Sequence, residues 1–157
     1  MKRIFFKKIF HIMNFIFLRL DPKQQVKFAI YMAEEVLKNY ETVLPEDTRP
    51  RQAIEAAKWC LISKHKKAAG MVAFEKAKEA YKAWHRLDDA VPLFARYAAH
   101  SASMAAFAAA YLSSDASFYS DKKMMFPNVE ESGFCAIFSA FNSETMKRYR
   151  LFIWEAK

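Results

Sequence analysis

The stretch LPEDTRPRQAIEAAKW, residues 44–59, combines a proline-bounded turn, closely spaced charges and the start of an amphipathic helix. Pro45 and Pro50 each fix their own φ and disfavour the α conformation at the preceding residue, so an earlier helix has to end here. Thr48 or Asp47 is a suitable cap for the next helix. Pro50 is tolerated in a first turn because an amide there has no intrahelical partner. The stretch therefore predicts a rigid corner between two helices.

Charged side chains fill this corner: Glu46, Asp47, Arg49 and Arg51. A fixed cluster of this kind either ties two helices together or meets a partner, and the pattern leaves both roles open. Arginine pairs bidentately with carboxylates in either role. We expect Arg51 to bind a partner, and we expect Arg49, which lies beside Pro50, to stabilise the fold.

Helical patterns lie on both sides of the corner. Asp21, Pro22 and Gln24 supply a cap, an N1 proline and a capping box, which predict a helix from residue 22 to about residue 43. Its apolar positions recur at intervals of three and four and are Val26, Ala29, Ile30, Ala33, Val36, Leu37 and Tyr40. A second helix is predicted over 49–62. Its expected buried residues are Ala53, Ile54, Ala57, Cys60 and Leu61.

Further helices are predicted over 68–85, from about Ala95 to Ala110, over 128–141 and from about residue 143. The expected buried side of the 68–85 helix carries Val72, Ala73, Lys76, Ala77, Ala80, Tyr81 and Trp84. The helix that follows it holds nine alanines, which allow close approach on several sides and predict a central position. Trp59 and Trp84 are expected to anchor the core.

Composition supports the same fold class. The chain has 157 residues, of which 54% are hydrophobic and only two are glycine, so a helical globule with a substantial core is expected. We predict an all-α, single-domain bundle of about six helices over residues 21–157, with an Ala-rich central helix.

A family resemblance begins near the corner. It rests on Tyr31, on Glu34 to Leu37, on Pro45 to Asp47, on Arg49 to Arg51, on Ala53 to Ala56 and Trp59, and on the later run Ala95 to His100. These residues resemble the immunity-5-like family, all-helical immunity proteins of bacterial polymorphic toxin systems, over about residues 28–112. The resemblance implies neutralisation of a cognate toxin protein by binding. The family pattern has a second His where this chain has Ala106, so no role that requires two histidines is implied.

Arg96 and His100 lie one helical turn apart. Their shared face is suited to an acidic group of a partner or to a carboxylate within the fold, such as Glu35 or Asp47. The candidate partner-binding residues are therefore Glu46, Asp47, Arg49, Arg51, Arg96 and His100.

Residues 1–20 have a different character, because they are basic and apolar and contain no acid. Three interpretations stay open: a helix docked on the body, an interfacial membrane helix that makes a peripheral contact, or an extension upstream of a start at Met13. The stretch is too short and too interrupted by charge to span a bilayer.

Other patterns disfavour an enzyme. No Gly-rich phosphate loop, nucleophile elbow or metal-ligand spacing occurs, so no catalytic residue, metal or cofactor is expected. Cys60 and Cys135 fit core thiols in a reducing cytoplasm, although a cross-link between them stays open. A pI near 9.5 makes a nucleic-acid or anionic-membrane binder the alternative function, but the absence of an aromatic-basic groove disfavours nucleic acid.

Overall fold

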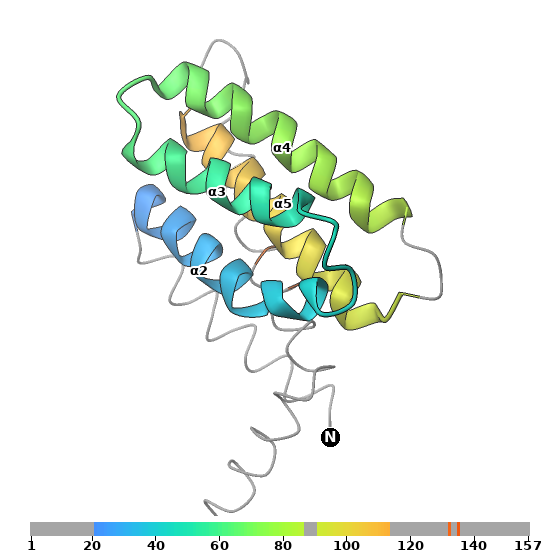
Figure 1. Cartoon of the computed structure of the whole chain (residues 1–157). Helices are drawn as coiled ribbons and strands as arrows, with labels where there is room; N and C mark the ends of the chain where they lie inside the picture. The colour runs from blue at the N-terminus through green and yellow to red at the C-terminus, as the bar shows by residue number, and fades with distance from the viewer. Residues whose placement is uncertain (1–20, 87–90, 114–131, 133–134, 136–157) are drawn as a thin grey trace, which may run out of the picture.

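The computed structural model describes residues 21–86, 91–113, 132 and 135. These residues form four α-helices, which are α2 (Pro22–Glu41), α3 (Arg49–Ile62), α4 (Lys66–Arg86) and α5 (Leu93–Ser113), and contain no strand (Figure 1). The all-α prediction is confirmed for this part of the chain. The number of six helices is not confirmed, because the segment 1–20 and the helices predicted from residue 128 onward lie outside the described residues.

Helix α2 begins as its sequence predicts. The Asp21 carboxylate accepts a 3.0 Å hydrogen bond from the Gln24 amide, and the Gln24 side chain accepts one from the Asp21 amide, which completes a capping box. All seven residues predicted for its apolar face are buried. The helix ends at Glu41, two residues before the predicted end, where the Thr42 hydroxyl donates to the Lys38 carbonyl at 2.7 Å.

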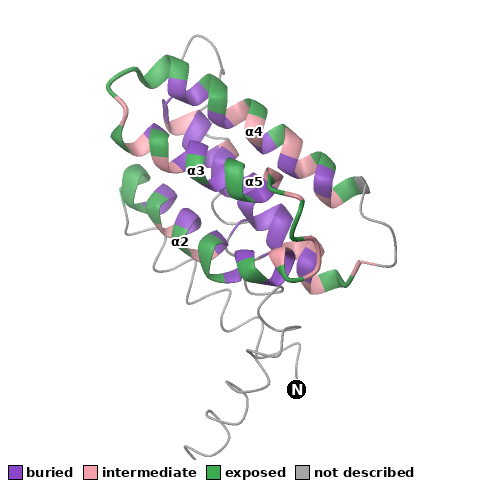
Figure 2. Ribbon diagram, in the orientation of Figure 1, coloured by how far each residue is buried: buried purple, intermediate pink, exposed green. Residues whose placement is uncertain are grey.

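Helix α5 packs against each of α2, α3 and α4, which confirms its predicted central place. Figure 1 shows it behind the layer formed by the other helices. All nine of its alanines are buried, and Figure 2 shows few exposed positions along it. Because alanine carries only a methyl group, neighbouring backbones can approach this helix on several sides.

Helix α4 meets α5 through small residues. Its buried positions are Ala69, Gly70, Ala73, Ala77, Ala80 and Ala83. A Cβ atom placed on Gly70 would lie 3.2 Å from Ser113 Cβ and 3.3 Å from the Ala110 carbonyl oxygen, so glycine permits the close approach here. The Ser103 hydroxyl donates a 2.9 Å hydrogen bond to the Ala77 carbonyl across the same interface.

Two predictions about large side chains are wrong. Trp59 is 41% exposed and does not anchor the core, and Val72 is exposed on the outer side of α4. The alanine-rich stripe takes the interior position in α4, and Ala53, Ile54, Ala57 and Cys60 take it in α3, so Val72 and Trp59 lie on the outward faces of these helices. Trp84 is half-buried and stacks on the His100 ring, with a centroid separation of 4.2 Å.

Both cysteines are free and buried, so the prediction of core thiols is confirmed and no cross-link joins them. Desolvation raises the pKa of the Cys60 thiol, which keeps it protonated at neutral pH.

Candidate partner-binding site

The corner between α2 and α3 is built around the Asp47 carboxylate. Oδ1 accepts hydrogen bonds from the Arg49 amide at 3.1 Å and from Arg49 Nε at 2.8 Å, and Oδ2 accepts one from Arg49 Nη2 at 2.5 Å. The Tyr40 hydroxyl also donates to Oδ2, at 2.6 Å. Asp47 is therefore held from both helices, by the last full turn of α2 and the first residue of α3.

These contacts change the acid–base behaviour of the corner. The hydrogen bonds from Arg49 lower the pKa of the Asp47 carboxyl to about 2, and the bond from Tyr40 acts in the same direction. Burial and the hydrogen bond to Asp47 raise the pKa of the Tyr40 hydroxyl. The Asp47 side chain raises the pKa of the Arg49 guanidinium. At neutral pH the carboxylate is thus charged and the phenol stays a donor.

Capping at the start of α3 follows one of the two predicted alternatives. Thr48 occupies the cap position, but its side chain makes no capping hydrogen bond and instead accepts one from Gln52 Nε2 at 2.9 Å. The Asp47 carboxylate is the group that receives a backbone N–H of the first turn. Asp47 therefore combines the capping role with the ion pair to Arg49.

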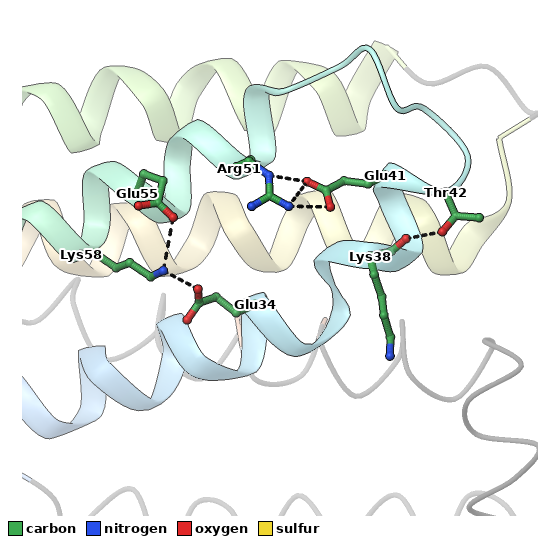
Figure 3. A network of polar contacts seen from close by, with 7 residues as sticks. All are labelled: Glu34, Lys38, Glu41, Thr42, Arg51, Glu55 and Lys58. Carbon is green, nitrogen blue, oxygen red and sulfur yellow. Dashed lines mark hydrogen bonds and ion pairs between the residues drawn. The ribbon is translucent and has the colours of Figure 1, made fainter.

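A second tie crosses from α3 to α2 on the outer surface. Arg51 Nε and Nη2 donate to the two carboxylate oxygens of Glu41 at 2.6 and 2.7 Å, and this hydrogen bonding raises the pKa of Arg51. Lys58 pairs with Glu34 of α2 and with Glu55 of its own helix. Figure 3 shows the two clusters side by side along the α2–α3 contact. The sequence prediction did not include Glu41 among the site residues.

The four predicted corner residues are therefore placed differently. Asp47 and Arg49 are partly buried and bound to one another. The Arg51 side chain is 54% exposed although it is paired, and Glu46 is exposed on the turn. These contacts tie the corner to both helices, and its most exposed charges are those of Glu46 and Arg51.

Arg96 and His100 both lie on α5, whereas the corner residues lie on α2, on α3 and in the turn between them. His100 is buried, stacks on Trp84 and lies 3.3 Å from the Cys135 thiol, measured from Nδ1 to Sγ. Desolvation, with a smaller contribution from His85, lowers the pKa of His100 to about 4. The expected alternative of a carboxylate within the fold is not realised with Asp47, which Tyr40 and Arg49 bind instead.

The setting of His100 favours an interior role for its neutral imidazole. Arg96 is half-buried, and its Nε atom is buried without a hydrogen-bond acceptor among the described residues. Because that atom is buried, a carboxylate brought by a partner would reach only the other donors of the half-buried guanidinium, and Arg96 stays a candidate contact through those donors alone. Contact of either residue with a toxin stays a prediction.

Sequence reasoning did not identify the surroundings of His100. Tyr81 and Trp84 lie on α4, and Cys135 follows His100 by 35 residues in the sequence. The spacing of Tyr81 and Trp84 indicated a shared buried side, but no periodic pattern connects either residue to His100. Only the packing of α4 on α5 brings them together.

Within residues 21–86, 91–113, 132 and 135, no three His, Cys, Asp or Glu side chains gather as metal ligands. None of the four described helices combines the length and apolar character needed to cross a membrane.

Comparisons with protein-family models, with curated proteins and with solved structures found no match to this chain. The resemblance to immunity-5-like proteins therefore stays a prediction.

Proposed function

We propose that this chain is an immunity protein that neutralises a cognate bacterial toxin by direct binding in the cytoplasm, without catalysis. The observation that carries the proposal is the pre-organised corner between α2 and α3, because the family resemblance includes most of its residues. Two bidentate arginine–carboxylate pairs hold this corner, so it keeps its shape when a partner approaches.

A fixed charged surface suits tight binding. Side chains that are already ordered lose little conformational entropy at an interface, and this loss otherwise costs roughly 0.5–1.5 kcal/mol per side chain. Glu41 engages Nε and Nη2 of Arg51. The donors of Nη1 face away from this pair and suit a carboxylate of the toxin. Glu46 supplies an exposed charge of opposite sign on the same turn.

The test uses the product of the neighbouring upstream reading frame as the toxin. Co-expression of this chain should rescue growth of cells that make the toxin, and the two purified proteins should form a complex. Arg51→Ala and Glu46→Lys should each weaken the complex and leave the melting temperature nearly unchanged. Truncating one partner of a desolvated charge pair at an interface costs roughly 2–5 kcal/mol.

Lys38→Ala is the matched control, because Lys38 is exposed on the last turn of α2 and its ammonium group points away from the Arg51–Glu41 pair (Figure 3). It should leave the affinity for the toxin unchanged. A neighbouring product that neither harms cells nor binds this chain would contradict the immunity function. A complex that forms with unchanged affinity in both corner variants would place the interface elsewhere.

A further inference from the structure

The connection between α3 and α4 carries a second surface, and charge sets it apart from the rest of the described chain. Residues 56–74 contain four lysines and one histidine and no aspartate or glutamate. Helix α4 beyond this segment pairs its charges internally, as Lys78 with Glu75 and Lys82 with Glu79. Lys58 pairs with Glu34 and Glu55 outside the segment, so the positive charge is concentrated in its later part, residues 64–67, where the sequence has three lysines and one histidine.

Large apolar side chains are exposed at the same place. Ile62, the last residue of α3, is 81% exposed, Trp59 one turn earlier is 41% exposed, and Met71 in the second turn of α4 is 49% exposed. Lys64, His65 and Lys67 are exposed between them. We name the exposed residues on both sides of this connection, which are Trp59, Ile62, Lys64, His65, Lys67 and Met71, the α3–α4 tip.

The tip has a fixed backbone. Lys66 Nζ donates a 2.7 Å hydrogen bond to the Cys60 carbonyl, which satisfies a free carbonyl at the end of α3. The Ser63 hydroxyl accepts one from the His65 amide at 3.0 Å. An open depression of about 400 Å³ is lined by His65, Lys66, Lys67, Ala68 and Met71. The cationic and apolar groups are thus presented by a structured turn.

The shape and the charge of the tip favour a flat anionic surface. Figures 1 and 2 show the α3–α4 connection projecting at one end of the bundle, with exposed residues around it. A second copy of this chain would oppose like charges across a twofold interface. A nucleic-acid backbone would engage the lysines but would leave Ile62 in water. A bilayer interface accepts both groups, because apolar and Trp side chains enter the headgroup boundary while lysines meet anionic lipids.

We propose that the α3–α4 tip is a peripheral contact site for anionic lipid bilayers. Ile62 and Trp59 enter the interfacial region, and Lys64 lies against the lipid phosphates and carboxylates. This site is separate from the α2–α3 corner, which lies at the other end of α3, so it does not depend on the proposed immunity function.

The experiment measures sedimentation of the full chain with phosphatidylcholine vesicles that contain about one third phosphatidylserine, and with pure phosphatidylcholine vesicles. The unmodified chain should bind the anionic vesicles, and raised salt should release it. Ile62→Asp and Lys64→Glu should each lower the partition coefficient by about tenfold or more.

Matched controls separate the tip from net charge and from other apolar surfaces. Leu93→Asp removes another exposed large apolar side chain, at the start of α5, and Lys38→Glu reverses a charge at the end of α2. Both controls should bind vesicles nearly as the unmodified chain does, and all four variants should show the unmodified helical circular-dichroism spectrum. If Ile62→Asp unfolds, Ile62→Ser replaces it, and if Lys64→Glu unfolds, Lys64→Gln replaces it. Each replacement should also lower the partition coefficient for the anionic vesicles.

Three outcomes would overturn the proposal. The first is no binding to anionic vesicles by the unmodified chain. The second is vesicle binding that survives both tip variants, which would assign the membrane contact to another segment. The third is binding of duplex DNA that Lys64→Glu abolishes and Ile62→Asp does not, without vesicle binding, which would identify a nucleic-acid surface.

Discussion

The Tyr40 hydroxyl, on a side chain with no exposed surface, donates a 2.6 Å hydrogen bond to the Asp47 carboxylate seven residues later. The same carboxylate accepts two side-chain hydrogen bonds from Arg49. One anionic group therefore connects the interior of α2 to the first residue of α3, and it fixes the direction in which the chain leaves the corner.

We expect Tyr40→Phe to lower the free energy of unfolding by roughly 1–3 kcal/mol, because it removes a charge-assisted hydrogen bond and leaves the ring packing intact. Urea denaturation measures the change. Tyr31→Phe is the control, since Tyr31 is exposed on the same helix and should change stability by less than about 0.5 kcal/mol. Equal stability of Tyr40→Phe and the unmodified chain would show that water replaces the bond without loss.

Substitution of the two corner arginines by alanine should change the free energy of unfolding by different amounts. Arg49→Ala leaves a partly buried carboxylate without its main partner and should cost roughly 1–3 kcal/mol. Arg51→Ala removes a solvent-exposed pair, whose contribution is about 0–1 kcal/mol. Thermal melts of both variants at low and high salt make the comparison. A larger loss for Arg51→Ala would mean that the outer pair, and not the Asp47 cluster, holds the corner.

The lowered pKa of His100 predicts that the fold loses stability in mild acid. Its pKa is near 6.5 in the unfolded chain and is lowered to about 4 in the fold, so below pH 6.5 the unfolded state binds more protons. The stabilisation is complete above pH 6.5 and is lost as the pH falls towards 4, with an upper limit of about 3 kcal/mol. Asp47 contributes to stability in a lower pH range. Its pKa is lowered to about 2, so its contribution is lost only as the pH falls below the ordinary pKa of an aspartate carboxyl.

The measurement is the free energy of unfolding at several pH values between 7 and 4, taken in parallel for the unmodified chain and for His100→Phe. The variant should lose part of the acid dependence in this window, while His65→Asn, at an exposed position, should keep all of it. Identical pH profiles for the unmodified chain and His100→Phe would contradict the assignment to His100.

Gly70→Ala tests the close approach of α4 and α5. In an exposed helix this change stabilises by about 1 kcal/mol, but here the added methyl group would press on Ser113 and on the backbone carbonyl of Ala110. A backbone oxygen cannot rotate away, so we expect a net destabilisation of roughly 1–3 kcal/mol, measured by denaturation. Ala68→Gly, at an exposed position of the same helix, should show the ordinary propensity effect. A more stable Gly70→Ala variant would mean that the two helices separate easily.

The sequence was sufficient to predict those features that depend on local patterns. The apolar spacing in α2 identified its buried face, and Pro45 and Pro50 located the corner because their constraints act on neighbouring residues. Trp59 and Val72 were placed wrongly because hydrophobicity alone does not say which apolar stripe faces the core. In an alanine-based interface the small residues take the interior and large ones are left outside.

The sequence identified the charged residues of the candidate site but not the residues with which they pair. The charges of the corner could be read from the sequence, whereas the choice of Tyr40 and Glu41 as their partners depends on how α2 and α3 cross. The neutral environment of His100 depends on Cys135 and on Trp84, which only tertiary packing brings to it. Long-range contacts of this kind leave no periodic signal.

The central position of α5 also has a consequence for biosynthesis. Helices α2, α3 and α4 emerge from the ribosome first, yet each of them packs against α5, which is the last of the four in the chain. Until Ser113 has left the exit tunnel, the nascent chain presents the inward faces of three helices without the element that covers them. We therefore expect the complete bundle to form during translation only after α5 has emerged, and we expect the uncovered faces to be accessible to chaperones in that interval.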